Sequence, residues 1–207
     1  MASGNPVHGA QARSIGLGAR SQLHRQDRAG ASERIARRLS GLTEFDGPGH
    51  VAGYWPVPGE VDLRGFWHQL HDAGVTVCLP RIDPTGSRSM EFRRWHPDCT
   101  MTDNRYGIPE PDGEPVSLEC LDVVVLPCVA LDDLGSRVGM GQGFYDRTLA
   151  GLAGLAPGRG PGHRPTTLIG VAFEVQRLRA PDVIVREDWD VPLDVVVTES
   201  AVLRPGA

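Results

Sequence analysis

Short apolar runs alternate along the chain with stretches in which apolar residues recur at helical spacing. Runs rich in β-branched residues predict buried strands at 75–81, 121–127, 168–174 and 195–198. A further strand begins at Val51 and runs into a Pro/Gly turn that carries Glu60 and Asp62. Helical spacing predicts helices over 63–73 and 144–155. Because such alternation implies parallel crossovers, we expect an α/β fold: a single three-layer α/β/α domain with a mainly parallel, open sheet.

The N-terminal region has a different character. Residues 1–12 mix Gly, Ala, Ser, Pro and His, which predicts a flexible tail before a domain spanning 13–207. Residues 13–42 carry many arginines and predict two helices. Ser32 can cap the second of these helices, and Gly41 can end it.

Three other segments predict less regular structure. The alternation over 90–95 is typical of an antiparallel or edge strand. Prolines within 98–115 exclude a helix, so we expect an irregular segment there. Residues 157–165 are rich in Gly, Pro and Arg and predict a mobile loop, and 195–198 is expected to be the last strand.

The most distinctive stretch, 135–147, reads Gly-Ser-Arg-Val-Gly-Met-Gly-Gln-Gly-Phe-Tyr-Asp-Arg. Its alternating glycines allow positive φ and let the backbone lie flush against a ligand. The stretch lies between the predicted strand at 121–127 and the predicted helix at 144–155. Free backbone N–H groups and the positive end of a helix dipole converge at such a place, which favours an anion.

Neither of the two best-known glycine loops fits this stretch. A P-loop ends in Gly-Lys-Ser/Thr, and the chain contains no lysine; the dinucleotide fingerprint needs G-x-G-x-x-G. A tight turn without a ligand is the alternative interpretation. Arg137, Asp146 and Arg147 favour a functional site, because they add phosphate-binding and metal-binding groups to the same turn. Glu60 and Arg81 also follow predicted strands, so we expect them at the same edge of the sheet.

Composition narrows the functional classes. The net charge of −5 and the absence of a basic block argue against a nucleic-acid partner. No apolar run approaches the ~18 residues that span a bilayer, and no signal peptide is visible, so we expect a soluble, cytoplasmic protein. The four cysteines are widely spaced, which argues against a zinc site, and Cys78 and Cys128 fit the core. With no lysine present, phosphate binding falls to arginine, backbone amides and a metal.

Several motifs occur in the order found in one enzyme family. They are 59–62 (Gly-Glu-Val-Asp), 79–81 (Leu-Pro-Arg), 106–111 (Tyr-Gly-Ile-Pro-Glu-Pro), 126–147, 171–176 and 190–198. With these motifs the chain resembles the 5-formyltetrahydrofolate cyclo-ligases, also called 5,10-methenyltetrahydrofolate synthetases. The resemblance covers most of residues 50–199, and the glycine stretch is its most specific part.

The resemblance implies a ring closure that depends on ATP and Mg²⁺. In this family the formyl oxygen of 5-formyltetrahydrofolate attacks the γ-phosphate of ATP, N10 adds to the activated carbon, and phosphate leaves. The products are 5,10-methenyltetrahydrofolate, ADP and phosphate. Since phosphorylation makes the formyl oxygen a good leaving group, the protein chiefly aligns the substrates and neutralises phosphate charge.

The resemblance also implies roles for residues of this chain. The implied ATP-binding residues are Arg13, Arg20, Arg137, Val138, Gly139, Met140, Gly141, Gln142, Gly143, Phe144 and Tyr145. The implied substrate-binding residues are Trp55, Glu60, Tyr106, Met140, Gly141, Gln142, Gly143 and Phe144. Arg81 and Arg147 are implied as the catalytic phosphate clamp. Asp146 and Asp190 are implied as the Mg²⁺ ligands, with Asp194 as a competitor of Asp190.

The N-terminal region departs from the family pattern. Family members commonly carry a lysine and an arginine in the first helix that contact ATP phosphates. The nearest candidates here are Arg13 and Arg20, in a segment that Gly16 and Gly18 weaken as a helix. Gln142 stands where some relatives place a charge.

Two alternatives to the ATP-driven cyclo-ligase stay open at this point. One is a catalytically weak family member that acts as a folate- or nucleotide-binding protein. The other is an enzyme of another class on a similar sheet, such as a sugar-phosphate isomerase or CoA-transferase relative. We expect a monomer, with a weak dimer as the alternative.

Overall fold

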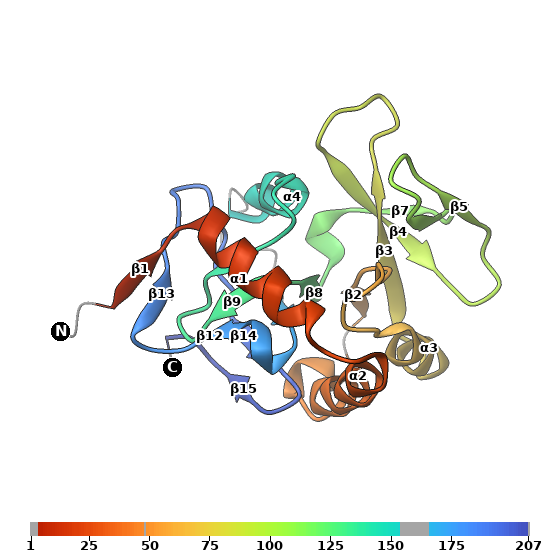
Figure 1. Cartoon of the computed structure of the whole chain (residues 1–207). Helices are drawn as coiled ribbons and strands as arrows, with labels where there is room; N and C mark the ends of the chain where they lie inside the picture. The colour runs from red at the N-terminus through yellow and green to blue at the C-terminus, as the bar shows by residue number, and fades with distance from the viewer. Residues whose placement is uncertain (1–3, 48, 154–165, 207) are drawn as a thin grey trace.

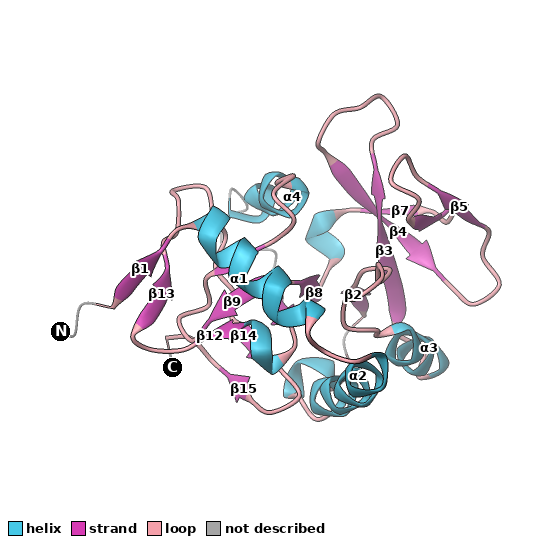
Figure 2. Cartoon of the chain, in the orientation of Figure 1, coloured by secondary structure: helices cyan, strands magenta, loops and turns pink. Residues whose placement is uncertain are grey.

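The computed structural model describes residues 4–47, 49–153 and 166–206. Its central sheet has five parallel strands: β2 (His50–Ala52), β3 (Thr76–Ile82), β8 (Val123–Pro127), β11 (Thr167–Val171) and β14 (Val195–Val197). At the edges, β4 (Met90–Trp95), β7 (Pro115–Val116) and β15 (Val202–Leu203) pair antiparallel. The order is β15-β14-β11-β8-β2-β3-β4-β7. Figures 1 and 2 label β14, β8, β2 and β3 across the middle of the molecule. The prediction of a mainly parallel, open sheet is confirmed.

Helices cover both faces of this sheet. The helices α2 (Arg25–Ser40) and α3 (Arg64–Asp72) lie at the bottom of Figure 1, and α4 (Phe144–Ala153) lies at the top. Val123 and Val125 of β8 pack in the cluster that contains residues of α2 and α3. Val124 and Leu126 pack in the cluster that contains Leu149 of α4. Because β8 is buried on both faces, its side chains on both faces are apolar. Burying each such side chain fully stabilises the fold by about 1.5–3 kcal/mol.

A second group of elements lies beside the central sheet. Its strands are β1 (Asn5–Val7), β9 (Ala130–Asp132), β10 (Arg137–Val138), β12 (Arg177–Leu178) and β13 (Asp182–Ile184). β1 pairs with β13, and β9 lies between β10 and β12. The helix α1 (Gly9–Ser21) packs here and continues through Gly16. A β-carbon at position 16 would lie 2.0 Å from the carbonyl oxygen of Val129, so a larger residue could not pack this closely. Gly16 therefore permits close helix packing rather than breaking the helix.

The remaining elements are short. They are η1 (Thr43–Phe45), β5 (Met101–Asp103), β6 (Pro109–Pro111), η2 (Leu118–Cys120) and η3 (Glu174–Gln176). Cys78 and Cys128 are buried in the core as expected, and burial raises the pKa of each thiol to about 12. None of the helices in the described segments is both long and apolar enough to span a bilayer.

Two predictions for the N-terminal region are wrong. Residues 5–12 are not a loose tail, because Asn5–Val7 pair with 182–184 and α1 begins at Gly9. This pairing joins segments that lie far apart in sequence and leaves no local pattern. Ser32 is not a helix cap, since α2 begins at Arg25; the buried Ser32 hydroxyl instead accepts the backbone N–H of Asp62 at 3.0 Å.

Three predictions for later segments also need correction. The segment 98–115 contains an antiparallel ribbon of β5 and β6. Its prolines, Pro109 and Pro111, occupy alternate positions of the edge strand β6, where a missing backbone N–H is tolerated. After β14 the chain turns back to form β15, so 195–198 is not the last strand. β9 and β10 intervene between β8 and the glycines, so the glycine loop follows a hairpin. The loop predicted over 157–165 lies outside the described residues.

Candidate active site

A cavity of about 770 Å³ opens at the carboxyl ends of the parallel strands. Pro80 and Ile82 from the end of β3, and Leu126 and Pro127 from the end of β8, form its floor. Most of the residues proposed from the sequence also line it: Arg13, Trp55, Glu60, Tyr106, Asp190 and every residue from Arg137 to Arg147. Segments separated by more than a hundred residues therefore meet in one cavity, at the edge where α/β sheets bind ligands.

The glycine loop, residues 139–143, is held by an arginine on each side. Arg13 of α1 donates from Nε to the carbonyl oxygen of Gly139 at 2.7 Å. Arg147 of α4 donates from Nη1 to the carbonyl oxygen of Gln142 at 2.8 Å. Gly141 and Gly143 have φ of +86° and +69°, which L side chains rarely adopt. The loop thus combines a fixed backbone with two neighbouring cationic groups.

Arg137 and Asp146 form an ion pair in the wall of the cavity. The Nη2 atom of Arg137 lies 2.7 Å from Oδ1 of Asp146. Arg137 is only 9% exposed, and within the described ranges its Nε is the one buried side-chain polar atom without a hydrogen-bond partner. A buried donor without an acceptor is costly. Arg137 also lines the cavity, so the ion pair places a largely buried cationic group in the cavity wall.

The two predicted metal ligands both face this cavity. Asp146 and Asp190 line it, and Oδ2 of Asp190 accepts the backbone N–H of Glu187 at 2.8 Å. Asp194 is not among the residues that line the cavity, and its carboxylate accepts the backbone N–H of Leu168 at 2.7 Å. In the part of the chain that the structure describes, no three His, Cys, Asp or Glu side chains gather as a metal site. Two carboxylates suit Mg²⁺ only when phosphate oxygens or waters complete the coordination.

The cavity lining also includes a carboxyl group and aromatic rings. Oε2 of Glu60 accepts the backbone N–H of Val57 at 3.1 Å, and burial raises the pKa of Glu60. Trp55 packs against the core with its ring centroid 6.3 Å from that of Trp95, and it also lines the cavity. Tyr106, half exposed, meets Phe144 edge to face at 6.3 Å. This wall can enclose a flat, polar heterocycle.

Tyr145 also lines the cavity, close enough to Glu60 for that charge to affect its phenol. Burial, helped by the charge of nearby Glu60, raises the pKa of the Tyr145 phenol. The phenol therefore stays neutral at physiological pH and can donate a hydrogen bond.

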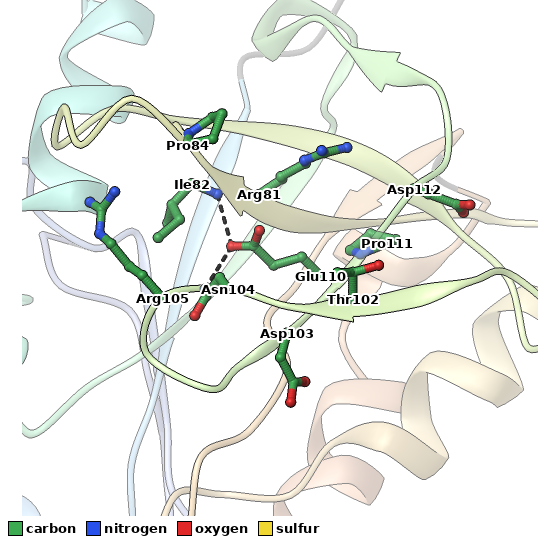
Figure 3. Close-up of a pocket in the computed structure, with 10 residues that line it drawn as sticks. All are labelled: Arg81, Ile82, Pro84, Thr102, Asp103, Asn104, Arg105, Glu110, Pro111 and Asp112. Carbon is green, nitrogen blue, oxygen red and sulfur yellow. Dashed lines mark hydrogen bonds between the residues drawn. The ribbon is translucent and has the colours of Figure 1, made fainter.

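Two of the proposed residues do not line the cavity. Arg20 lies near the end of α1 beside Gly59, and its positive charge offsets part of the rise in the pKa of Glu60. Arg81 follows Pro80 on β3, and strand alternation directs it away from the face on which Pro80 and Ile82 meet the cavity. It lines a smaller cavity of about 310 Å³ next to the β5–β6 ribbon (Figure 3).

The cavity also contains residues that sequence reasoning missed. They include Arg88, Asn104, Glu110, Glu187 and Trp189. Trp189 is 67% exposed and directly precedes Asp190, a proximity that could have drawn attention to it. Arg88 and Asn104 lie in segments with no distinctive pattern, and only the fold brings them here.

Comparison with known proteins agrees with this geometry. Residues 10–199 match the 5-formyltetrahydrofolate cyclo-ligase family. The 5-formyltetrahydrofolate cyclo-ligase of Escherichia coli K12 is 37% identical over 155 residues, covering 73% of this chain and 79% of that protein. The enzyme of that name from Haemophilus influenzae is 30% identical, with 81% and 85% covered.

Solved structures lead to the same result. The 5,10-methenyltetrahydrofolate synthetase of Aquifex aeolicus superposes with a TM-score of 0.78 at 31% identity, covering 96% of this chain and 93% of that one. The synthetase of Mycoplasma pneumoniae, at 20% identity and a TM-score of 0.70, shares the fold. On the sequence match and the shared architecture together, the chain belongs to the 5-formyltetrahydrofolate cyclo-ligase family.

Proposed function

We propose that this protein converts 5-formyltetrahydrofolate to 5,10-methenyltetrahydrofolate, using ATP with Mg²⁺ and releasing ADP and phosphate. The observation that carries the proposal is that the glycine loop, held by Arg13 and Arg147, lines one cavity together with Arg137 and the aromatic rings of Trp55, Tyr106 and Phe144. One side suits phosphates and the other suits a heterocycle. Because a single chain lines both sides, we propose that it acts as a monomer.

On the ATP side, the glycine loop would lie along the triphosphate. Its exposed backbone has no β-carbon in the way at three alternate positions. Arg137 lines the cavity next to the loop, and guanidinium groups match phosphate geometry well. Arg13 takes the place of the N-terminal lysine common in relatives, since it already contacts the loop.

The carboxylates of Asp146 and Asp190 would hold Mg²⁺ together with phosphate oxygens and water. When bound, the ion neutralises phosphate charge as the phosphoryl group is transferred. Arg137 already neutralises Asp146 in the free protein, so the negative charge of that carboxylate is balanced before ligands arrive.

On the folate side, Glu60 and Tyr106 would bind and orient the reduced pterin, with Trp55 and Phe144 as apolar walls. The formyl oxygen must point at the γ-phosphate, and N10 must lie next to the formyl carbon. Phosphorylation of the formyl oxygen breaks the bond from the γ-phosphate to ADP. Attack by N10 then closes the ring and expels phosphate, so the protein needs no nucleophile of its own.

A direct assay tests the proposal. Purified protein is mixed with 5-formyltetrahydrofolate, ATP and Mg²⁺, and the near-ultraviolet absorbance of the methenyl product is followed. We expect a rise that requires ATP. No rise, or a rise that persists without ATP, would refute the proposed reaction. Nucleotide or folate binding without turnover would instead support a family member that has become a binding protein.

The metal assignment has its own test. Asp146→Asn keeps the size of the side chain and removes its charge, so turnover should fall steeply while the circular dichroism spectrum stays that of the folded wild type. The melting temperature should fall as well, because the buried Arg137 loses its charged partner. Full activity of this variant at limiting Mg²⁺ would show that Asp146 is not a metal ligand.

A further inference from the structure

A chain of hydrogen bonds links the central sheet to the folate-side wall of the cavity. It begins at Glu110 on β6, whose side chain lies between the larger and the smaller cavity. Glu110 is only 9% exposed. Its Oε1 accepts the backbone N–H of Ile82 at 2.9 Å and the side-chain Nδ2 of Asn104 at 2.7 Å (Figure 3). One oxygen atom thus ties β3 to the turn of the β5–β6 ribbon.

Asn104 continues the chain into the turn. Its Oδ1 accepts the backbone N–H of Tyr106 at 2.8 Å and that of Ile108 at 3.2 Å. The turn is closed by the backbone N–H of Asn104, which donates to the carbonyl oxygen of Ile108 at 2.9 Å. Gly107, with φ of +72°, permits the reversal. The side chain of Asn104 therefore fixes the backbone of Tyr106 and of Ile108.

Arg105 secures the same turn from the other side. Its guanidinium donates to the carbonyl oxygens of Asp83 at 2.9 Å and Ser87 at 3.1 Å. The same group lies 5.2 Å from the centroid of the Tyr106 ring and 6.0 Å from that of Phe144. An aromatic side chain that is half exposed to solvent is in this way held in one place at the cavity mouth.

We propose that Glu110 is a positioning residue, which sets Tyr106 against the folate through Asn104. The inference rests on the proposed function, because it assigns the folate to this wall. A side chain on a flexible turn must lose conformational freedom when a ligand binds, and fixing it beforehand removes that cost. The role requires only an acceptor at Oε1, so an amide oxygen in its place should serve as well as the carboxylate.

The test uses Glu110→Ala, Glu110→Gln and Tyr106→Ala, with Asp112→Ala as the matched control. Asp112 is an exposed carboxylate two positions away, on the edge of the smaller cavity (Figure 3). Hydrogen exchange of the Tyr106 and Ile108 amides is measured in the ligand-free protein. In Glu110→Ala we expect exchange there to accelerate about tenfold, the ratio that corresponds to one lost hydrogen bond of ~1.4 kcal/mol. Glu110→Gln and the control should match the wild type.

Steady-state kinetics provide the second readout. Glu110→Ala should raise KM for 5-formyltetrahydrofolate about tenfold and leave KM for ATP within about twofold, because only the folate wall is released. In a Tyr106→Ala background the same substitution should add little, since both residues act through one contact. If Glu110→Ala does not fold, Asn104→Ala breaks the next link and replaces it.

The possible results separate this inference from the proposed function. Unchanged amide exchange in Glu110→Ala, equal rises in both KM values, or additive effects with Tyr106→Ala would overturn the positioning role. Loss of protection in Glu110→Gln equal to that in Glu110→Ala would also overturn it. If the wild-type protein has no turnover, the proposed function fails, and amide exchange still decides whether Glu110 fixes the turn.

Discussion

Gly143→Ala should destabilise the protein, whereas Gly139→Ala, four residues earlier in the same loop, should not. At Gly143 φ is +69°, and a β-carbon would lie 2.8 Å from Nη1 of Arg147. At Gly139 φ is not in the positive range, and a β-carbon would have nothing within 4 Å. The two substitutions have the same chemistry and differ only in backbone conformation and space.

The expected magnitude follows from these contacts. Alanine in the left-handed region costs roughly 1–2 kcal/mol. The methyl group also displaces Arg147 from the carbonyl oxygen of Gln142, a hydrogen bond worth about 1 kcal/mol. The lower chain entropy of alanine in the unfolded state offsets about 0.5 kcal/mol. We therefore expect Gly143→Ala to lose about 2 kcal/mol, and Gly139→Ala to gain up to about 1 kcal/mol, because only the entropy effect applies there.

Calorimetry of ligand-free protein in EDTA measures both changes. For a chain of this length 1 kcal/mol shifts Tm by about 2–4 °C, so Gly143→Ala should melt about 4–8 °C below the wild type. Urea unfolding should give the same order with unchanged slope. A Tm for Gly143→Ala equal to that of the wild type, or an equal fall in Gly139→Ala, would show that the positive φ and the Arg147 contact do not constrain the loop.

Three further predictions concern charged groups. Burial raises the pKa of Glu60 from its usual 4.5, so the contribution of Glu60 to stability is complete at low pH and is lost as pH rises through the raised pKa. Glu60→Gln should therefore have a higher Tm than the wild type at pH 7. The difference in Tm should vanish below about pH 4. A Tm difference independent of pH would contradict this. Asp190→Ala should raise the Mg²⁺ concentration needed for half-maximal turnover with little change in Tm, because the Glu187 N–H that loses its acceptor is exposed to water. Asp194→Ala should lower Tm more, because its bond to the Leu168 N–H is partly buried, and should leave the Mg²⁺ requirement unchanged; the reverse pattern would exchange their roles. Arg137→Met leaves the Asp146 carboxylate, 24% exposed, without its partner, so urea unfolding should show a loss of about 2 kcal/mol, less than the 3–5 kcal/mol of a fully buried pair.

The parallel core and the glycine loop could be predicted because their signals are local. The apolar run in β8 is buried on both faces, and that condition leaves a continuous pattern of Val and Leu in the sequence. The glycines at 141 and 143 are needed for positive φ, which few other residues provide. Glu60 and Asp190 could be proposed because the motifs around them resemble those of a known family.

The remaining features depend on contacts that leave no local pattern. Arg81 was expected in the site because it follows a strand, yet strand alternation places it on the other side from Pro80 and Ile82. Arg20 was proposed for ATP, but the course of α1 brings it beside Gly59. Glu110 appeared only as part of a motif, because its partners come from the distant strand β3 and from a turn.

Because α1 packs so closely at Gly16, a mutational survey of this protein should find that position 16 does not tolerate substitution. Gly16 lies one helical turn beyond Arg13, and a β-carbon there would lie 2.0 Å from the Val129 carbonyl oxygen and 3.1 Å from Cβ of Ala130. Any larger residue must push α1 outward and carry Arg13 away from Gly139. In a library selected for activity, position 16 should therefore vary as little as the residues that contact the substrates, although it contacts neither of them.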